Sequence, residues 1–62
     1  MENIKEIIAQ NLVELRKKNN LTQNDLAKKL NYSDNTISRW EHAEITPSIE
    51  TLQAISEIYS IS

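Results

Sequence analysis

Three polar residues with complementary hydrogen-bonding chemistry follow one another closely in the chain: Asn35, Ser38 and Arg39. At 100° per residue in a helix, all three lie on one face, opposite the apolar Ile37 and Trp40. An asparagine amide pairs with adenine through one donor and one acceptor, and an arginine forks onto guanine or onto a phosphate. The spacing therefore predicts a helix face suited to the base edges of the DNA major groove.

Composition excludes several other chemistries. The 62 residues contain no cysteine, no glycine and one histidine, so we expect no metal site, no cofactor and no glycine-rich phosphate loop. The three aromatic residues are too few for a base-stacking platform, and Trp40 is interpreted as core. The carboxylates are scattered and the chain is too short to wall a pocket, so we do not expect an enzyme.

Charge is distributed unevenly along the chain. The net charge is −2, but residues 16–39 hold six of the seven cations against two carboxylates, which leaves this segment at +4. The preceding segment, 1–15, carries −2, and the following one, 40–62, carries −4. Because a phosphate partner responds to the nearest face, the central segment predicts binding to a polyanion despite the negative total.

The first predicted helix spans residues 4–18. Its expected apolar stripe has helical spacing and consists of Ile4, Ile8, Leu12 and Leu15. Asn3 with Glu6 three residues later is typical of a helix N-cap. The second predicted helix spans 23–30, with Thr22 as its cap and Asp25 in its first turn. Asn31 tolerates the left-handed conformation and can end this helix as glycine usually does.

The third predicted helix spans residues 34–41 and begins after Ser33, a capping residue. We interpret His42 as a residue of the loop that follows. The fourth predicted helix spans 48–59 and is opened by Pro47, with Thr46 or Ser48 as its cap. Its expected buried face consists of Leu52, Ile55 and Tyr59, with Ile58 as a possible addition. We therefore predict an all-α fold of one domain, residues 1–62.

Two short helices joined by Asn31 and Tyr32 form a helix-turn-helix pattern. This geometry places the second helix in the major groove, with its N-terminal residues on base edges. The starts of the helices present free backbone N–H groups, which favour phosphate oxygens. We expect phosphate contacts from four residues: Thr22, Gln23, Ser33 and Thr36.

Residues 15–62 resemble the phage-repressor and Cro type of helix-turn-helix domain, the XRE family. The resemblance rests on several motifs in order: Leu15-Arg16, Leu21-Thr22-Gln23, Asp25-Leu26-Ala27, Ser33, Ile37-Ser38-Arg39-Trp40-Glu41, Pro47-Ser48 and Thr51-Leu52. It implies a compact bundle of four to five helices, like that of the lambda repressor. It also implies sequence-specific binding of double-stranded DNA by a transcriptional regulator, with repression favoured.

The resemblance assigns roles position by position. Gln23 matches a glutamine that contacts phosphate and braces the first recognition residue. Arg16 and Glu41 match a pair that forms a buried salt bridge. The recognition positions that would contact bases are Asp34, Asn35, Ser38 and Arg39. The chain departs from the family pattern where Asn31 replaces a usual glycine and where His42-Ala43 replaces a common Asn-Gly.

The resemblance also implies a homodimer on a palindromic operator. The resemblance gives the helix 48–59 and the tail after Tyr59 as the dimer surface. Because little chain follows Tyr59, we expect a monomer in dilute solution that pairs mainly on DNA, and a stable free dimer would mean that Ile58, Tyr59 and Ile61 suffice as an interface. We further expect a cytoplasmic bacterial or phage protein, of which these residues form the N-terminal part. The alternative hypothesis is a protein-interaction module of the same fold, such as an antitoxin, which would not need the positive segment.

Overall fold

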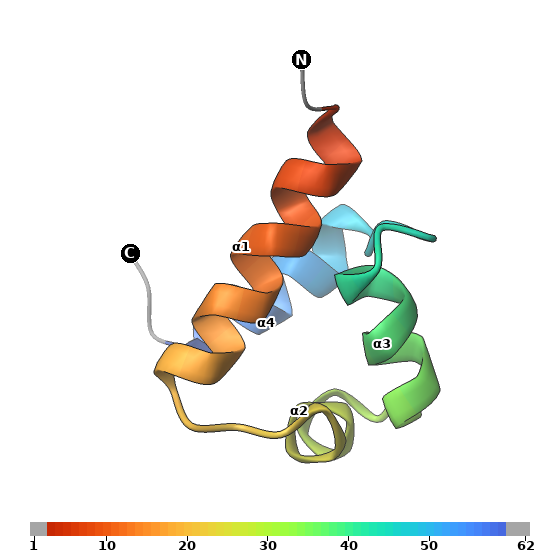
Figure 1. Ribbon diagram of the computed structural model, residues 1–62. Helices are drawn as coiled ribbons and strands as arrows, with labels where there is room; N and C mark the ends of the chain where they lie inside the picture. Colours follow the sequence, from red (N-terminus) through yellow and green to blue (C-terminus); the bar gives the residue numbers. More distant parts are fainter. Residues whose placement is uncertain (1–2, 60–62) are drawn as a thin grey trace.

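The computed structural model describes residues 3–59, which form four helices and no strand. Helix α1 spans Ile4–Lys18, α2 spans Gln23–Leu30, α3 spans Asp34–Glu41 and α4 spans Ile49–Tyr59. In Figure 1, α2 is seen nearly end-on below α1, α3 stands to the right, and α4 crosses behind α1. The predicted all-α class is confirmed, and no helix in the described part is long and apolar enough to cross a membrane.

Side-chain caps begin the first three helices at the predicted residues. Asn3 accepts a hydrogen bond from the backbone N–H of Glu6 (2.9 Å), and Ser33 accepts one from that of Thr36 (3.3 Å). At α2, Thr22 and Asp25 bond reciprocally, each side chain to the other's backbone N–H at 3.0 Å. Each cap satisfies a backbone donor that the helix leaves without a partner, so each start is determined locally.

A left-handed residue follows each of the first three helices within two positions of its end, although the chain has no glycine. Asn20, Asn31 and Ala43 have φ values of 58°, 62° and 60°. At each of these turns, a backbone N–H donates to the carbonyl five residues earlier: Leu21 to Arg16, Tyr32 to Ala27, and Glu44 to Arg39. These are Schellman-type stops, in which asparagine fits well and alanine bears a steric cost at Cβ.

Helix α4 corrects two predictions about its start. The helix begins at Ile49 rather than at residue 48. Of the two expected caps, Ser48 is the one that accepts from the backbone N–H of Thr51, at 3.2 Å. Pro47 therefore lies before the cap and is buried, instead of occupying the first helical position. Proline has no N–H, so it is compatible with this place outside the helix.

Each of the four helices contributes one face to the hydrophobic core. Its buried members are Leu12, Leu26, Ala27, Ile37, Trp40, Ile55 and Tyr59, with Ile8, Leu15, Leu21, Leu30, Leu52 and Ile58 packed against them. Helix α2 packs most extensively on α3, which holds the two helices as one unit. The Tyr32 ring meets Trp40 edge-on, with centroids 5.2 Å apart, and closes the turn between α2 and α3.

The predicted stripe on α1 is wrong at its first residue. Ile4 is 70% exposed, whereas Ala9, which the stripe omitted, is buried with Leu12. Figure 1 shows the reason, since the first turns of α1 extend beyond the other helices and have little to pack against. Helical spacing indicates which residues share a face, but the lengths and positions of neighbouring helices decide how much of that face is covered.

Candidate nucleic-acid interface

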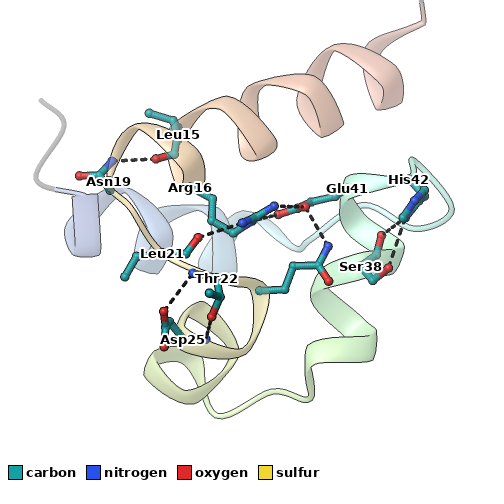
Figure 2. Close-up of polar contacts among 10 residues, drawn as sticks. Leu15, Arg16, Asn19, Leu21, Thr22, Asp25, Ser38, Glu41 and His42 are labelled. Atoms are coloured by element: carbon teal, nitrogen blue, oxygen red, sulfur yellow. Dashed lines mark hydrogen bonds and ion pairs between the residues drawn. The ribbon is translucent and has the colours of Figure 1, made fainter.

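A cluster of polar groups ties α1 to the end of α3, and we call it the clamp: the side chains of Arg16, Gln23 and Glu41 with the backbone oxygen of Leu21. Arg16 donates from Nε to Glu41 Oε2 at 2.6 Å and from Nη2 to Oε1 at 3.0 Å, a bidentate pair. Its Nη1 donates to the backbone oxygen of Leu21 at 2.8 Å, and Figure 2 shows these bonds converging between the helices. The side chains of Arg16 and Glu41 are only 13% and 5% exposed.

The clamp shifts the protonation equilibria of both charged groups. Burial raises the pKa of Glu41, but the hydrogen bonds from Arg16 and Gln23 and the charge of Arg16 together lower it by more, so the net pKa lies below its ordinary value. The hydrogen bond to Glu41 raises the pKa of Arg16, and this effect exceeds the lowering caused by burial. Both shifts favour the charged forms, so the pair stays ionised and holds the first helix of the bundle against the third.

Gln23 lies in the clamp as well as at the start of α2. Its Nε2 donates to Glu41 Oε1 at 3.0 Å, and its side chain is half-buried. This side chain was expected to contact phosphate, and nothing in the sequence pattern predicted its bond to Glu41. An amide nitrogen has two hydrogens, so one can hold Glu41 while the second remains for a phosphate oxygen. Gln23 thus connects the core of the bundle to the expected DNA surface.

The expected base-contacting residues lie along α3 on the side away from the core. Asp34, Asn35 and Arg39 are exposed and Ser38 is half-exposed, whereas Ile37 and Trp40 on the other side are 0% and 4% exposed. We call these four residues the outer face of α3. Since α3 is pinned to α2 by the core and to α1 by the clamp, its outer face is presented on a rigid support.

Arg39 forms a weak ion pair with Glu44, a residue of the loop after α3. Its Nε lies 3.7 Å from Glu44 Oε1, and the two side chains are 53% and 57% exposed. An exposed ion pair at this distance contributes only about 0–1 kcal/mol to the free energy of unfolding, so Arg39 can leave it to bind another group. The guanidinium can exchange this carboxylate for a phosphate or a guanine.

The four expected phosphate contacts lie at two helix starts. Thr22 and Gln23 open α2, and Ser33 with Thr36 opens α3. The Ser33 and Thr36 hydroxyls lie 3.1 Å apart, so one of them can donate to the other and leave a second hydrogen for an outside acceptor. Exposed N–H groups and the positive end of the helix dipole favour an anion at both places.

His42 lies in the turn after α3, within the segment expected to be a loop. It is also the C-cap of α3, and its imidazole turns back onto the helix. Its Nδ1 lies 2.7 Å from the backbone oxygen of Ser38 and 3.3 Å from Ser38 Oγ, as Figure 2 shows. The signal in the sequence was the spacing of four residues between a serine and a histidine at a helix end.

Comparison with known proteins agrees with this geometry. A family model described as helix-turn-helix matches residues 12–62. The chain is also similar to the HTH-type transcriptional activator BcrR of Enterococcus faecalis, with 41% identity over 51 residues. That match covers 82% of this chain and 25% of the relative, so the chain spans a quarter of the length of that protein.

Proposed function

This chain belongs to the helix-turn-helix family of transcription regulators, of the XRE type, and from that premise we propose that it reads a specific double-stranded DNA sequence with α3. The observation that carries the proposal is the contrast between the two sides of α3. Ile37 and Trp40 are buried in the core, while Asn35 and Arg39 are exposed on the outer face. A rigid helix with base-reading side chains on its free side is suited to the major groove.

The proposed roles divide into base and phosphate contacts. Asn35 pairs with adenine, Arg39 with guanine or a phosphate, and Asp34 and Ser38 complete the base-reading set. Thr22, Gln23, Ser33 and Thr36 hold phosphates on either side of the groove and set the register. The exposed lysines at the ends of α1 and α2, Lys17, Lys18, Lys28 and Lys29, add to the positive field of this segment.

Selection of bound sequences from a random DNA pool tests the division of roles. Asn35→Ala should cost about 1–3 kcal/mol on the preferred site and relax the preference at one base pair. Gln23→Ala should weaken binding nearly equally on all sequences, because phosphate contacts carry no direct sequence information. Gln53→Ala, at an exposed position of α4, serves as the control and should bind like the wild type.

The outcome that would contradict this assignment is a reversal. If Gln23→Ala changed the selected sequence and Asn35→Ala did not, α3 would not be the reading helix. Because Gln23 also belongs to the clamp, thermal melts of each variant must accompany the selection. A folded wild-type chain that enriches no sequence at all would favour the protein-interaction module instead.

We propose that the domain is monomeric in dilute solution and pairs on a palindromic operator. Tyr59 is 8% exposed and Ile55 is 2% exposed, so the inner side of α4 is already used by the core. Ile58 also packs against that core, and Ile61 lies outside the described residues. Half-sites about 34–36 Å apart would accommodate two domains whose Cα atoms span 32 × 27 × 22 Å. Sedimentation of the protein without DNA tests this, and a stable dimer at low micromolar concentration would contradict it.

The direction of regulation is a further proposal. The relative is named an activator. We favour repression for this domain, because a domain bound across a promoter excludes polymerase without any additional contact. A reporter with the selected operator overlapping the promoter tests this, and a rise in expression would indicate activation. We also propose that the protein acts in the bacterial cytoplasm, where such an operator is accessible.

A further inference from the structure

The turn that ends α3 places a carboxylate beside the arginine of the outer face. The backbone N–H of Glu44 donates to the backbone oxygen of Arg39 at 3.0 Å, and the preceding Ala43 is left-handed, with φ 60°. This turn brings residue 44 back alongside the last turn of the helix. Glu44 Oε1 lies 3.7 Å from Arg39 Nε, and within residues 3–59 no other carboxylate comes within 4 Å of this guanidinium. The backbone of the turn, and not charge alone, therefore keeps Glu44 beside Arg39.

The carboxylate lies at one edge of the guanidinium and leaves the other donors free. An arginine carries five N–H donors, one on Nε and two on each Nη. Glu44 lies nearest to Nε. A guanine needs two donors, one for O6 and one for N7. The two Nη groups of Arg39 can supply both of them while Glu44 stays where it is.

The ion pair also distinguishes a neutral partner from an anionic one. Guanine carries no net charge, so Arg39 can bind it with Glu44 in place. A phosphate that approached the same guanidinium would come close to the Glu44 carboxylate, and like charges repel. Both side chains are more than half exposed, so water and salt weaken this repulsion. Glu44 therefore biases the choice of partner and does not prohibit a phosphate.

We propose that Glu44 is a positioning residue that directs Arg39 to a guanine of the operator and away from the phosphates. The inference rests on the proposed function, under which Arg39 has both of these partners. A phosphate contact adds affinity for every sequence, whereas a bidentate contact to guanine specifies a base. Glu44 thus lowers the affinity for DNA in general and raises the selectivity at one base pair.

Selection from a random DNA pool tests the inference with four proteins: wild type, Arg39→Met, Glu44→Gln and Glu57→Gln. The wild type should prefer guanine at one position by about 5- to 100-fold, the discrimination of one bidentate pair. Arg39→Met should lose that preference. Glu44→Gln should weaken it by about 2- to 5-fold, the most that an exposed ion pair contributes. Glu57→Gln removes the same charge at an exposed position near the end of α4 and should keep the preference.

The salt dependence of binding to DNA of random sequence gives a second readout, which a merely structural role of Glu44 would not change. The slope of log affinity against log salt steepens by about 0.9 for each phosphate neutralised. Glu44→Gln leaves Arg39 free to bind a phosphate, so its slope should steepen by up to about 0.9 and its affinity for random DNA should rise. Glu57→Gln should change the slope much less. Thermal melts establish that each variant is folded.

The outcomes separate failure of this inference from failure of the proposed function. If the wild type enriches a sequence and Glu44→Gln keeps the full preference for guanine, the inference is overturned and the DNA-reading function stands. The same holds if Arg39→Met changes no base preference, or if Glu44→Gln and Glu57→Gln steepen the slope equally. If the folded wild type enriches no sequence, the proposed function fails and the inference fails with it.

Discussion

Two arginine–glutamate pairs join α3 to the rest of the molecule in opposite ways. Arg16 and Glu41 are bidentate, 2.6 Å apart at their closest, and 13% and 5% exposed. Arg39 and Glu44 are 3.7 Å apart and more than half exposed. The residue types are the same, but water screens only the second pair. The comparison shows how one helix can be held firmly on one side and left available to a ligand on the other.

The largest expected effect follows from breaking the clamp. Arg16→Met or Glu41→Leu leaves the remaining charge buried without its partner and should cost about 3–5 kcal/mol of the free energy of unfolding. The double variant should lose less than the sum of the two single variants, because it leaves neither charge. Urea denaturation of all four proteins measures the coupling, and simple additivity would show that the pair does not act as a unit.

Acid should weaken the same clamp by a smaller amount. The pKa of Glu41 in the folded protein lies below its ordinary value, so the unfolded chain binds the proton more readily. The stabilisation is therefore complete above the ordinary pKa of a glutamate, about 4.3, and is lost as the pH falls through the folded pKa. Urea midpoints from pH 7 downward measure this loss, which Glu41→Gln should reduce.

Asp25 contributes to the same acid dependence and has to be separated from Glu41. The hydrogen bond from the backbone N–H of Thr22 lowers the pKa of Asp25, and the Thr22 side chain adds to this. Asp25→Asn should therefore remove only its own part of the loss. If Asp25→Asn removed most of the fall in the urea midpoint at low pH and Glu41→Gln did not, the clamp would not be the principal acid-sensitive element.

The turn after α3, which separates Glu41 from Glu44, can be made more stable by substitution at Ala43. Ala43 has φ 60°, a left-handed conformation that an alanine Cβ disfavours by about 1–2 kcal/mol. Ala43→Gly removes that cost but adds freedom to the unfolded chain, so a net gain of about 0.5–1 kcal/mol is expected. Thermal melts measure it, with Ala54→Gly inside α4 as the matched control. That control should lose stability by a similar amount, and a loss at Ala43 would contradict the assignment of strain.

The smallest expected effect is at the exposed pair. Glu44→Gln should change the free energy of unfolding by no more than about 0.5 kcal/mol, since the pair is screened by water. Binding to DNA at low salt should tighten, because a negative charge beside Arg39 is removed. Melts and a binding titration measure both quantities. A loss of stability as large as that of Glu41→Leu would erase the distinction between the two pairs.

Sequence reasoning located the helices because their boundaries depend on nearest neighbours. Thr22 and Asp25 cap α2 across three residues, and Asn31 ends it through its own left-handed conformation. The predicted ranges of α1, α2 and α3 coincide with the observed ones, and α4 differs by one residue. The Arg16–Glu41 pair was expected from the family resemblance alone, since nothing in a separation of 25 residues predicts a contact.

The sequence by itself determined which residues share a helix face and where the first three helices start and stop, because those features depend on bonds spanning three to five residues. Only the tertiary structure decided which faces are covered. It left Ile4 exposed at the overhanging start of α1 and turned the amide of Gln23 toward Glu41. Whether two polar groups meet depends on the crossing of helices, and that crossing is set by the packing of the whole core rather than by any local pattern.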